Sequence, residues 1–219
     1  MLQQATIDFL KKLEKNNNKE WFDKNRKLYE AAKADYEAFV TAVYAELTKL
    51  EPRLAEHKAK DAIFRIFRDV RFAKDKSPYK ANFGAYMSRG GKKSPDAGYY
   101  IHLQPGGKSF LAGGMWMPEG PVLKKVRQEL DYNFKEFQGI INKASFKKLF
   151  TKWEGETLKT IPQGYTADNP AIEFLKMKSV IVSIPMDDAD YTSKTAVSKV
   201  VKLFTEMKPL VDFLNRSLD

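Results

Sequence analysis

Apolar side chains recur at helical spacing between residues 28 and 50, and this pattern constrains the fold more than any other feature of the 219-residue chain. The apolar positions are three or four residues apart, and they are Leu28, Ala32, Tyr36, Phe39, Val43, Leu47 and Leu50. Such a face predicts a long amphipathic helix that ends before Pro52. The stretch is too short, and too poor in flanking charge pairs, to indicate a coiled coil.

Other helical patterns lie on both sides of this helix. They are expected at residues 4–15, at 119–131, in two short pieces across 132–152, from Asn169 with Pro170 onward, and from Val197 to Leu218. Asn17, with Glu20 three residues later, predicts a capping box that starts the helix before Pro52. Pro209 is expected to kink or split the last helix, because proline removes a main-chain donor.

Four segments rich in Tyr, Phe and branched side chains predict strands, and they lie at residues 83–88, 98–104, 109–116 and 180–184. Pro105 to Lys108 predicts a hairpin turn between the second and third strands. The order of helices, strands and helices predicts an α+β fold in which a small, mostly antiparallel sheet packs with N- and C-terminal helices. No linker interrupts the pattern, so a single domain over residues 1–219 is expected.

Residues 61–70 are ambiguous between helix and strand. Their apolar side chains are Ile63, Phe64, Ile66, Phe67 and Val70, which fit helical spacing better than alternation. We therefore predict a short helix there, capped by Asp61.

Composition excludes several classes of protein. The chain has no cysteine, which rules out disulfides, thiolate metal sites and cysteine nucleophiles. No run approaches the roughly 18 apolar residues needed to span a bilayer, so no membrane partner is expected. Residues 1–15 lack the apolar core and cleavage site of a secretory signal, which makes the cytoplasm the expected location.

Familiar nucleotide and hydrolase motifs are incomplete. Gly107-Lys108-Ser109 resembles the end of a phosphate loop, but His102 stands where that loop requires glycine. No dinucleotide-binding glycine pattern and no serine elbow occurs. The sequence thus implies no organic cofactor.

Metal sites are equally poorly supported. The two histidines, His57 and His102, are far apart and lie in no zinc-binding spacing. Asp187, Asp188 and Asp190 could hold a hard cation, but acidic residues at a helix start are explained by the helix dipole alone. No metal is predicted.

Positive charge gathers in the middle of the chain. The formal net charge is +10, and residues 61–120 contribute 10 basic and 5 acidic side chains, half of the excess. A basic balance favours anionic partners such as phosphate-containing ligands or nucleic acid. Solubility alone is the competing explanation.

The most concentrated group of cations lies between residues 65 and 80. The candidate anion-binding residues are Arg65, Arg68, Asp69, Arg71, Lys76, Tyr79 and Lys80, together with His102. On a helix, Arg65, Arg68, Asp69 and Phe72 would share one face, and an Arg held by a carboxylate suits bidentate binding of phosphate. The alternative is that the Arg and Asp side chains pair with each other and only tie a loop to the core.

The chain also resembles the conserved hypothetical family called domain of unknown function 2461. The resemblance rests on blocks that span nearly the whole sequence: Phe9-Leu10, Asn16-Asn17, Glu20 to Phe22, Arg26, Tyr29, Phe64 to Ile66, Arg68 to Phe72, Asp75 to Lys80, Gly98 to Tyr100, Gly113 to Pro118, Leu158-Lys159, Pro162 to Tyr165, Asn169 to Ile172, and Lys178. Thr160-Ile161-Pro162 departs from the basic, proline-rich stretch expected there, so this loop is not expected to add cations to a site. The family has no established activity, so the resemblance implies an architecture and no catalytic residue.

Three functions remain open at this point. The first is binding of a phosphorylated small molecule or a nucleic acid through the segment at residues 65–80. The second is an enzyme that acts on an anionic substrate, with Asp69, Tyr79 or His102 handling protons. The third is a structural or protein-interaction role for the basic loop.

Overall fold

The computed structural model describes residues 1–71 and 74–219. Within these residues lies a four-stranded antiparallel sheet whose strands neighbour one another in chain order. The strands are β1 (Phe83–Ser88), β2 (Gly98–Leu103), β3 (Phe110–Met115) and β4 (Val180–Pro185). Each predicted strand is confirmed, with its ends correct to within one residue.

Helices precede the sheet, separate β3 from β4, and follow β4. They are α1 (Gln4–Lys15), α2 (Lys19–Lys24), α3 (Arg26–Thr48), the 3-10 turns η1 (Pro52–Glu56) and η2 (Ala59–Ala62), α4 (Gly120–Tyr132), α5 (Phe134–Ile141), α6 (Ala144–Leu149), α7 (Ile172–Leu175), α8 (Asp188–Thr192) and α9 (Ala196–Arg216). The α+β fold predicted from the sequence is confirmed. The helix expected to start at Asn169 begins at Ile172 instead, and the Asn169 side chain accepts a hydrogen bond from the Ala171 amide (2.8 Å).

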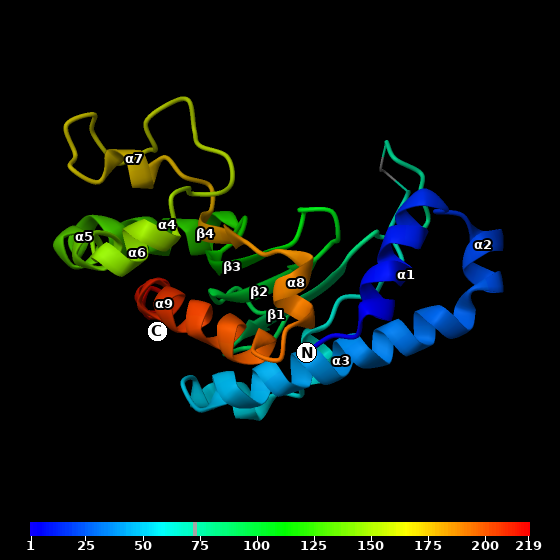
Figure 1. Ribbon diagram of the computed structural model, residues 1–219. Helices are drawn as coiled ribbons and strands as arrows, with labels where there is room; N and C mark the ends of the chain where they lie inside the picture. The colour runs from blue at the N-terminus through cyan, green and yellow to red at the C-terminus, as the bar shows by residue number, and fades with distance from the viewer. Residues whose placement is uncertain (72–73) are drawn as a thin grey trace.

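The inner face of the sheet forms the core with α3 and α9, which run along one side of it (Figure 1). Ala85, Ile101, Leu111 and Val182, one from each strand, are fully buried there. Gly113 lets α9 approach β3 closely, because a Cβ at this position would lie 2.6 Å from the Met207 sulfur. Burial of this face supplies the main driving force for folding.

Helix α9 continues through Pro209 from Ala196 to Arg216, so the helix is not split there. Met207, Leu210 and Val211 on either side of the proline are buried in the core. Their burial stabilises the helix on both sides of the proline, despite the main-chain hydrogen bond that proline cannot donate.

The outer face of the sheet carries aromatic and polar side chains that are only half buried, namely Tyr86, Tyr100, His102 and Phe110. Strand pairing sets Tyr86 opposite Tyr100 and His102 opposite Phe110. These side chains are less buried than those of the inner face, which packs against α3 and α9. This face is therefore the one on which a ligand site can form.

The predicted helix at residues 61–70 is wrong. The chain leaves η2 in an extended conformation, and the Phe64 amide donates to the Gly84 carbonyl of β1 (2.9 Å). A second bridge joins Phe67 to Tyr79, with hydrogen bonds that flank it. Main-chain groups far away in the sequence thus take the hydrogen bonds that a helix would need, so Arg65, Arg68 and Asp69 do not share a helical face. Phe72, which was expected on the same face, lies outside the described residues.

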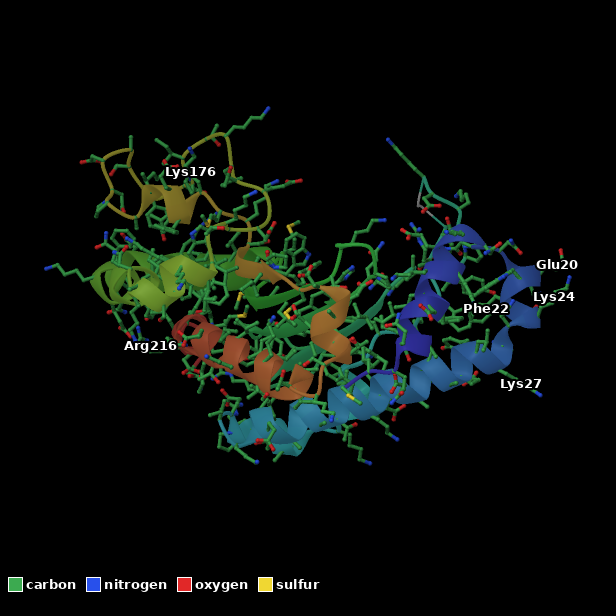
Figure 2. All side chains as sticks on the ribbon, viewed as in Figure 1. Glu20, Phe22, Lys24, Lys27, Lys176 and Arg216 are labelled. Atoms are coloured by element: carbon green, nitrogen blue, oxygen red, sulfur yellow. The ribbon has the colours of Figure 1, made fainter. Side chains whose placement is uncertain are left out.

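The predicted capping box at Asn17 is also wrong by one residue. Asn18 is the N-cap of α2, and its side chain accepts from the Trp21 amide (2.9 Å). Glu20 instead pairs with Lys24 (2.7 Å), at the solvent-exposed end of α2 in Figure 2. Asn17 is thereby left free to hold a distant segment of the chain.

Asp187, Asp188 and Asp190 lie at the N-terminus of α8, as N-cap and first-turn residues. Asp187 and Asp190 form a capping box, and Asp188 pairs with Lys11 (2.9 Å). In the part of the chain that the structure describes, no group of three or more His, Asp or Glu side chains is arranged to hold a metal. The described helices also include none that is both long and apolar enough to cross a membrane.

Candidate anion-binding site

Four of the eight charged residues of the segment 65–80 form ion pairs with each other. Arg68 forms an ion pair with Asp75, and Arg71 binds both carboxylate oxygens of Asp69 at 3.0 and 2.7 Å. Lys76 donates to the Val70 carbonyl (3.0 Å). These contacts lie within the segment itself, so Arg71, Asp69 and Lys76 stabilise the conformation of the loop.

Tyr79 packs into the protein. Its ring stacks on Phe22, with 3.9 Å between centroids and 13° between planes. Figure 2 places Phe22 on the inner side of α2, toward α1. One face of the Tyr79 ring is thus already occupied, and burial raises the pKa of its hydroxyl. Tyr79 therefore anchors the loop next to the site.

Lys80 differs from Arg68 and Arg71 because its ammonium group lies against an aromatic ring and not against a carboxylate. Its ammonium nitrogen lies 5.5 Å from the centroid of the Phe64 ring, and the ammonium nitrogen of Lys92 lies 5.2 Å from the same centroid. Both contacts are within cation–π range. Lys92 also donates to the Ile63 carbonyl (2.7 Å), which fixes its position on the ring.

The surroundings of Lys80 disfavour its positive charge. Burial lowers the pKa of its ammonium group, and the nearby cations Arg65, Lys92 and Arg68 lower it further. Among the described residues, no carboxylate forms an ion pair with Lys80, although Arg68 and Lys108 close by have acidic partners. A half-buried cation without a counterion is costly unless an anion joins it.

His102 lies on the outer face of β2, where it contacts Asn82 and Gln104, two residues that line a cleft together with Lys80. Its Nδ1 atom is 3.1 Å from the Tyr100 hydroxyl and 3.4 Å from the Asn82 amide nitrogen, and its Nε2 atom is 3.0 Å from the Gln104 side-chain oxygen. Because Asn82 can only donate there and the Gln104 oxygen can only accept, these assignments favour the neutral ring with its proton on Nε2.

The imidazole is held neutral as well as oriented. Burial lowers the pKa of His102, opposed in part by its hydrogen bond to Gln104. The ring also stacks on Phe110, with centroids 4.6 Å apart and planes 14° apart. Both ring nitrogens have partners, so His102 in this arrangement is a fixed member of a polar network.

A cleft of about 640 Å³ joins the cations to this network. Its lining includes Arg68 and Lys80, together with Asn82 and Gln104, the two amide partners of His102. Asp69 and Tyr79 also line it. The structure therefore brings Arg68, Asp69, Tyr79 and Lys80 around one cleft, and His102 contacts its lining through Asn82 and Gln104. Arg65, Arg71, Lys76 and His102 do not line the cleft themselves.

Sequence reasoning missed five residues of this site: Phe64, Lys92, Asn82, Tyr100 and Gln104. One signal was present, because Tyr100, His102 and Gln104 alternate along a strand and so share a face. The partnership of Phe64 with both lysines had no such signal, since it depends on Ile63 and Phe64 pairing with Ala85 and Gly84 of β1.

Comparison with known families gives one match. The family model described as conserved hypothetical protein (DUF2461) matches residues 5–213. Neither the curated proteins nor the solved structures contain a match to the chain.

Proposed function

The chain belongs to the conserved hypothetical family DUF2461, and we propose that it binds an anionic, phosphate-bearing ligand in the cleft lined by Lys80. The observation that carries the proposal is the Lys80 ammonium group, half buried against Phe64 among Arg65, Arg68 and Lys92 without an acidic partner in the described chain. A bound anion would offset the mutual repulsion of these cations.

The polar groups of the cleft suit a phosphate rather than an isolated chloride-like ion. The Asn82 and Gln104 side chains each have an amide nitrogen, and Arg68 adds a guanidinium group at the cleft wall. Phosphate oxygens accept several hydrogen bonds at once, and charge-assisted bonds of this kind are the stronger ones. The acidic side chains of the same cleft already have cationic or hydroxyl partners: Asp75 with Arg68, Asp69 with Arg71 and Glu14 with Lys108.

Catalysis on such an anion is the second candidate, and the Tyr100–His102 contact favours it. A hydroxyl 3.1 Å from an imidazole nitrogen is within reach for proton transfer. However, burial raises the pKa of Tyr100 and lowers that of His102, so both groups are neutral and the proton stays on Tyr100. We therefore place ligand binding first.

A thermal-shift titration with inorganic phosphate and pyrophosphate tests the proposal. A ligand present at about 100 times its Kd adds about 2.7 kcal/mol of stability, which for a chain of this size raises Tm by roughly 5–10 °C. Lys80→Gln should remove most of this shift. Lys27→Gln is the matched control, because Lys27 projects from α3 into solvent away from the cleft (Figure 2).

Two results would contradict the proposal. One is the absence of any shift in the wild-type protein with either anion. The other is an equal loss of the shift in Lys80→Gln and Lys27→Gln, which would mean that net charge alone is responsible.

A further inference from the structure

A second cleft, of about 420 Å³, shares no lining residue with the first. Its lining contains four lysines, which are Lys58, Lys60, Lys92 and Lys93. Asp61 is the single carboxylate that lines it, and none of the four lysines forms an ion pair within the described part of the chain. This cleft is therefore more strongly cationic than the first.

Phe64 and its two lysines connect the clefts. Lys80 lines the first cleft, Lys92 lines the second, and the ammonium nitrogen of each lies within 5.5 Å of the centroid of the Phe64 ring. Phe64 is 36% exposed, and Phe67, three residues along the same extended segment, is 42% exposed. Lys92, Phe64 and Lys80 thus lie together at the β1 edge of the sheet, where the Phe64 amide donates to Gly84. Phe67 packs farther along the segment, against Phe22 and Tyr79.

We propose that this edge binds single-stranded nucleic acid, with phosphates in both clefts and a base against Phe64. The inference rests on the proposed function, because the Lys80 cleft is one of the two phosphate positions, and it adds the second cleft and the class of ligand. Proteins that bind single strands combine a cationic groove with aromatic side chains on which unstacked bases lie.

Two features favour a strand over a single nucleotide or a duplex. A mononucleotide would leave the lysines of the second cleft without a counterion, whereas a strand extends phosphates into both clefts. A base can stack on the Phe64 ring only if one face of the base is free. The bases of a duplex are already stacked on each other, so a single strand fits better. Charge complementarity and ring exposure therefore point to the same partner.

Fluorescence anisotropy with a labelled oligothymidylate of about twelve nucleotides tests the inference. If about four phosphates are neutralised, the logarithm of the binding constant should fall with the logarithm of salt concentration with a slope of roughly −3. Phe64→Ala should weaken binding about fivefold or more, and Phe64→Tyr, which keeps a ring, should retain it.

A matched pair of charge variants separates this surface from net charge. Lys60→Gln/Lys93→Gln removes two exposed cations of the second cleft, and Lys27→Gln/Lys33→Gln removes two exposed cations of α3. The first double variant should bind the oligonucleotide several-fold more weakly and the second should bind like the wild type. Equal losses in the two, or tighter binding of a duplex of the same length, would overturn the inference.

The small anions distinguish this inference from the function on which it rests. If pyrophosphate shifts Tm through Lys80 but the oligonucleotide does not bind, the extended surface is wrong and the anion cleft stands. If neither ligand binds, both are wrong. If an acidic peptide such as oligoglutamate binds as tightly as the oligonucleotide, the edge is a general polyanion surface and the nucleic-acid assignment fails.

Discussion

Asn17 holds the main chain of Tyr79 at both ends of its carboxamide group: its Nδ2 atom donates to the Tyr79 carbonyl (2.8 Å) and its Oδ1 atom accepts from the Tyr79 amide (3.1 Å). These two bonds join the start of the chain to the residue that precedes Lys80. The stacking of Tyr79 on Phe22 strengthens the same junction. The position of Lys80 in the cleft therefore depends on α1 and α2, far away in sequence.

Replacing Asn17 should loosen this junction. Asn17→Ala removes the partners of two main-chain groups, and we expect a loss of about 1–3 kcal/mol in the free energy of unfolding, measured by urea denaturation. Asn16→Ala is the control, because the Asn16 side chain forms one exposed hydrogen bond to Lys12 within the same helix end (2.9 Å). Similar losses for both variants would show that the two-point contact adds nothing.

Asn215, near the other end of the chain, forms the same kind of two-point contact with the main chain of Ala97. The Ala97 amide donates to its Oδ1 atom (2.8 Å), and its Nδ2 atom donates to the Ala97 carbonyl (3.2 Å). Asn215 is 4% exposed and Ala97 is fully buried, unlike the half-buried Asn17. Asn215→Ala should therefore cost more, about 2–4 kcal/mol.

Asn215→Asp provides the sharper measurement for this contact. The carboxylate keeps the acceptor for the Ala97 amide but faces the Ala97 carbonyl with a second oxygen instead of a donor. A loss of stability at least as large as that of Asn215→Ala is expected. An unfolding midpoint equal to that of the wild type would show that the contact is dispensable.

The sequence predicted the elements whose evidence is local. The helix before Pro52 and the four strand segments rich in Tyr, Phe and branched side chains depend on residues that are close together, and both are confirmed as α3 and β1 to β4. The two ends of the predicted apolar face, Leu28 and Leu50, are exposed. The predicted helix at 61–70 failed because Phe64 finds its hydrogen-bond partner in Gly84, twenty residues away. Apolar spacing records which side chains are buried but carries no information about a distant main-chain partner.

The same limit applies to the site. Composition placed the excess charge in the middle of the chain, and Lys80 and His102 were among the predicted residues. The sequence could not show which arginines form local ion pairs, because Arg68 and Arg71 each have more than one aspartate within seven residues. Pairing depends on the path of the loop, and that path is set by Asn17 and Phe22 on another part of the chain.

The low pKa of His102 predicts a loss of stability in mild acid. Burial keeps the folded-state pKa below the ordinary value of about 6.5, so the unfolded chain binds the proton more readily. Stability is therefore highest above the unfolded-state pKa and falls as the pH decreases through about 6.5 toward the folded-state pKa. Urea denaturation of the wild type at about pH 7.5 and about pH 5.5 should show this fall.

The variant His102→Gln isolates this contribution. Glutamine can accept from Tyr100 and donate to Gln104 but does not titrate in this range, so the acid-dependent loss should shrink relative to the wild type. An unchanged pH dependence in His102→Gln would assign the effect to other groups.

The low pKa of Lys80 predicts an unusually reactive amine. Only the neutral amine reacts with acylating reagents, and burial together with Arg65, Lys92 and Arg68 raises the neutral fraction of Lys80. At about pH 8, brief labelling with acetic anhydride followed by peptide mass spectrometry should modify Lys80 faster relative to its accessibility than the exposed Lys27. Arg65→Gln, which removes one neighbouring cation, should slow the reaction at Lys80 alone.

A bound anion should reverse this reactivity. Phosphate next to the ammonium group favours the charged form, so it should raise the pKa of Lys80 and reduce its labelling, while labelling of Lys27 stays constant. Sodium chloride at the same ionic strength is the control for screening of charge. Equal protection by phosphate and chloride would show that screening, and no bound ligand, governs the amine. Protection by phosphate alone would place the anion at Lys80 itself.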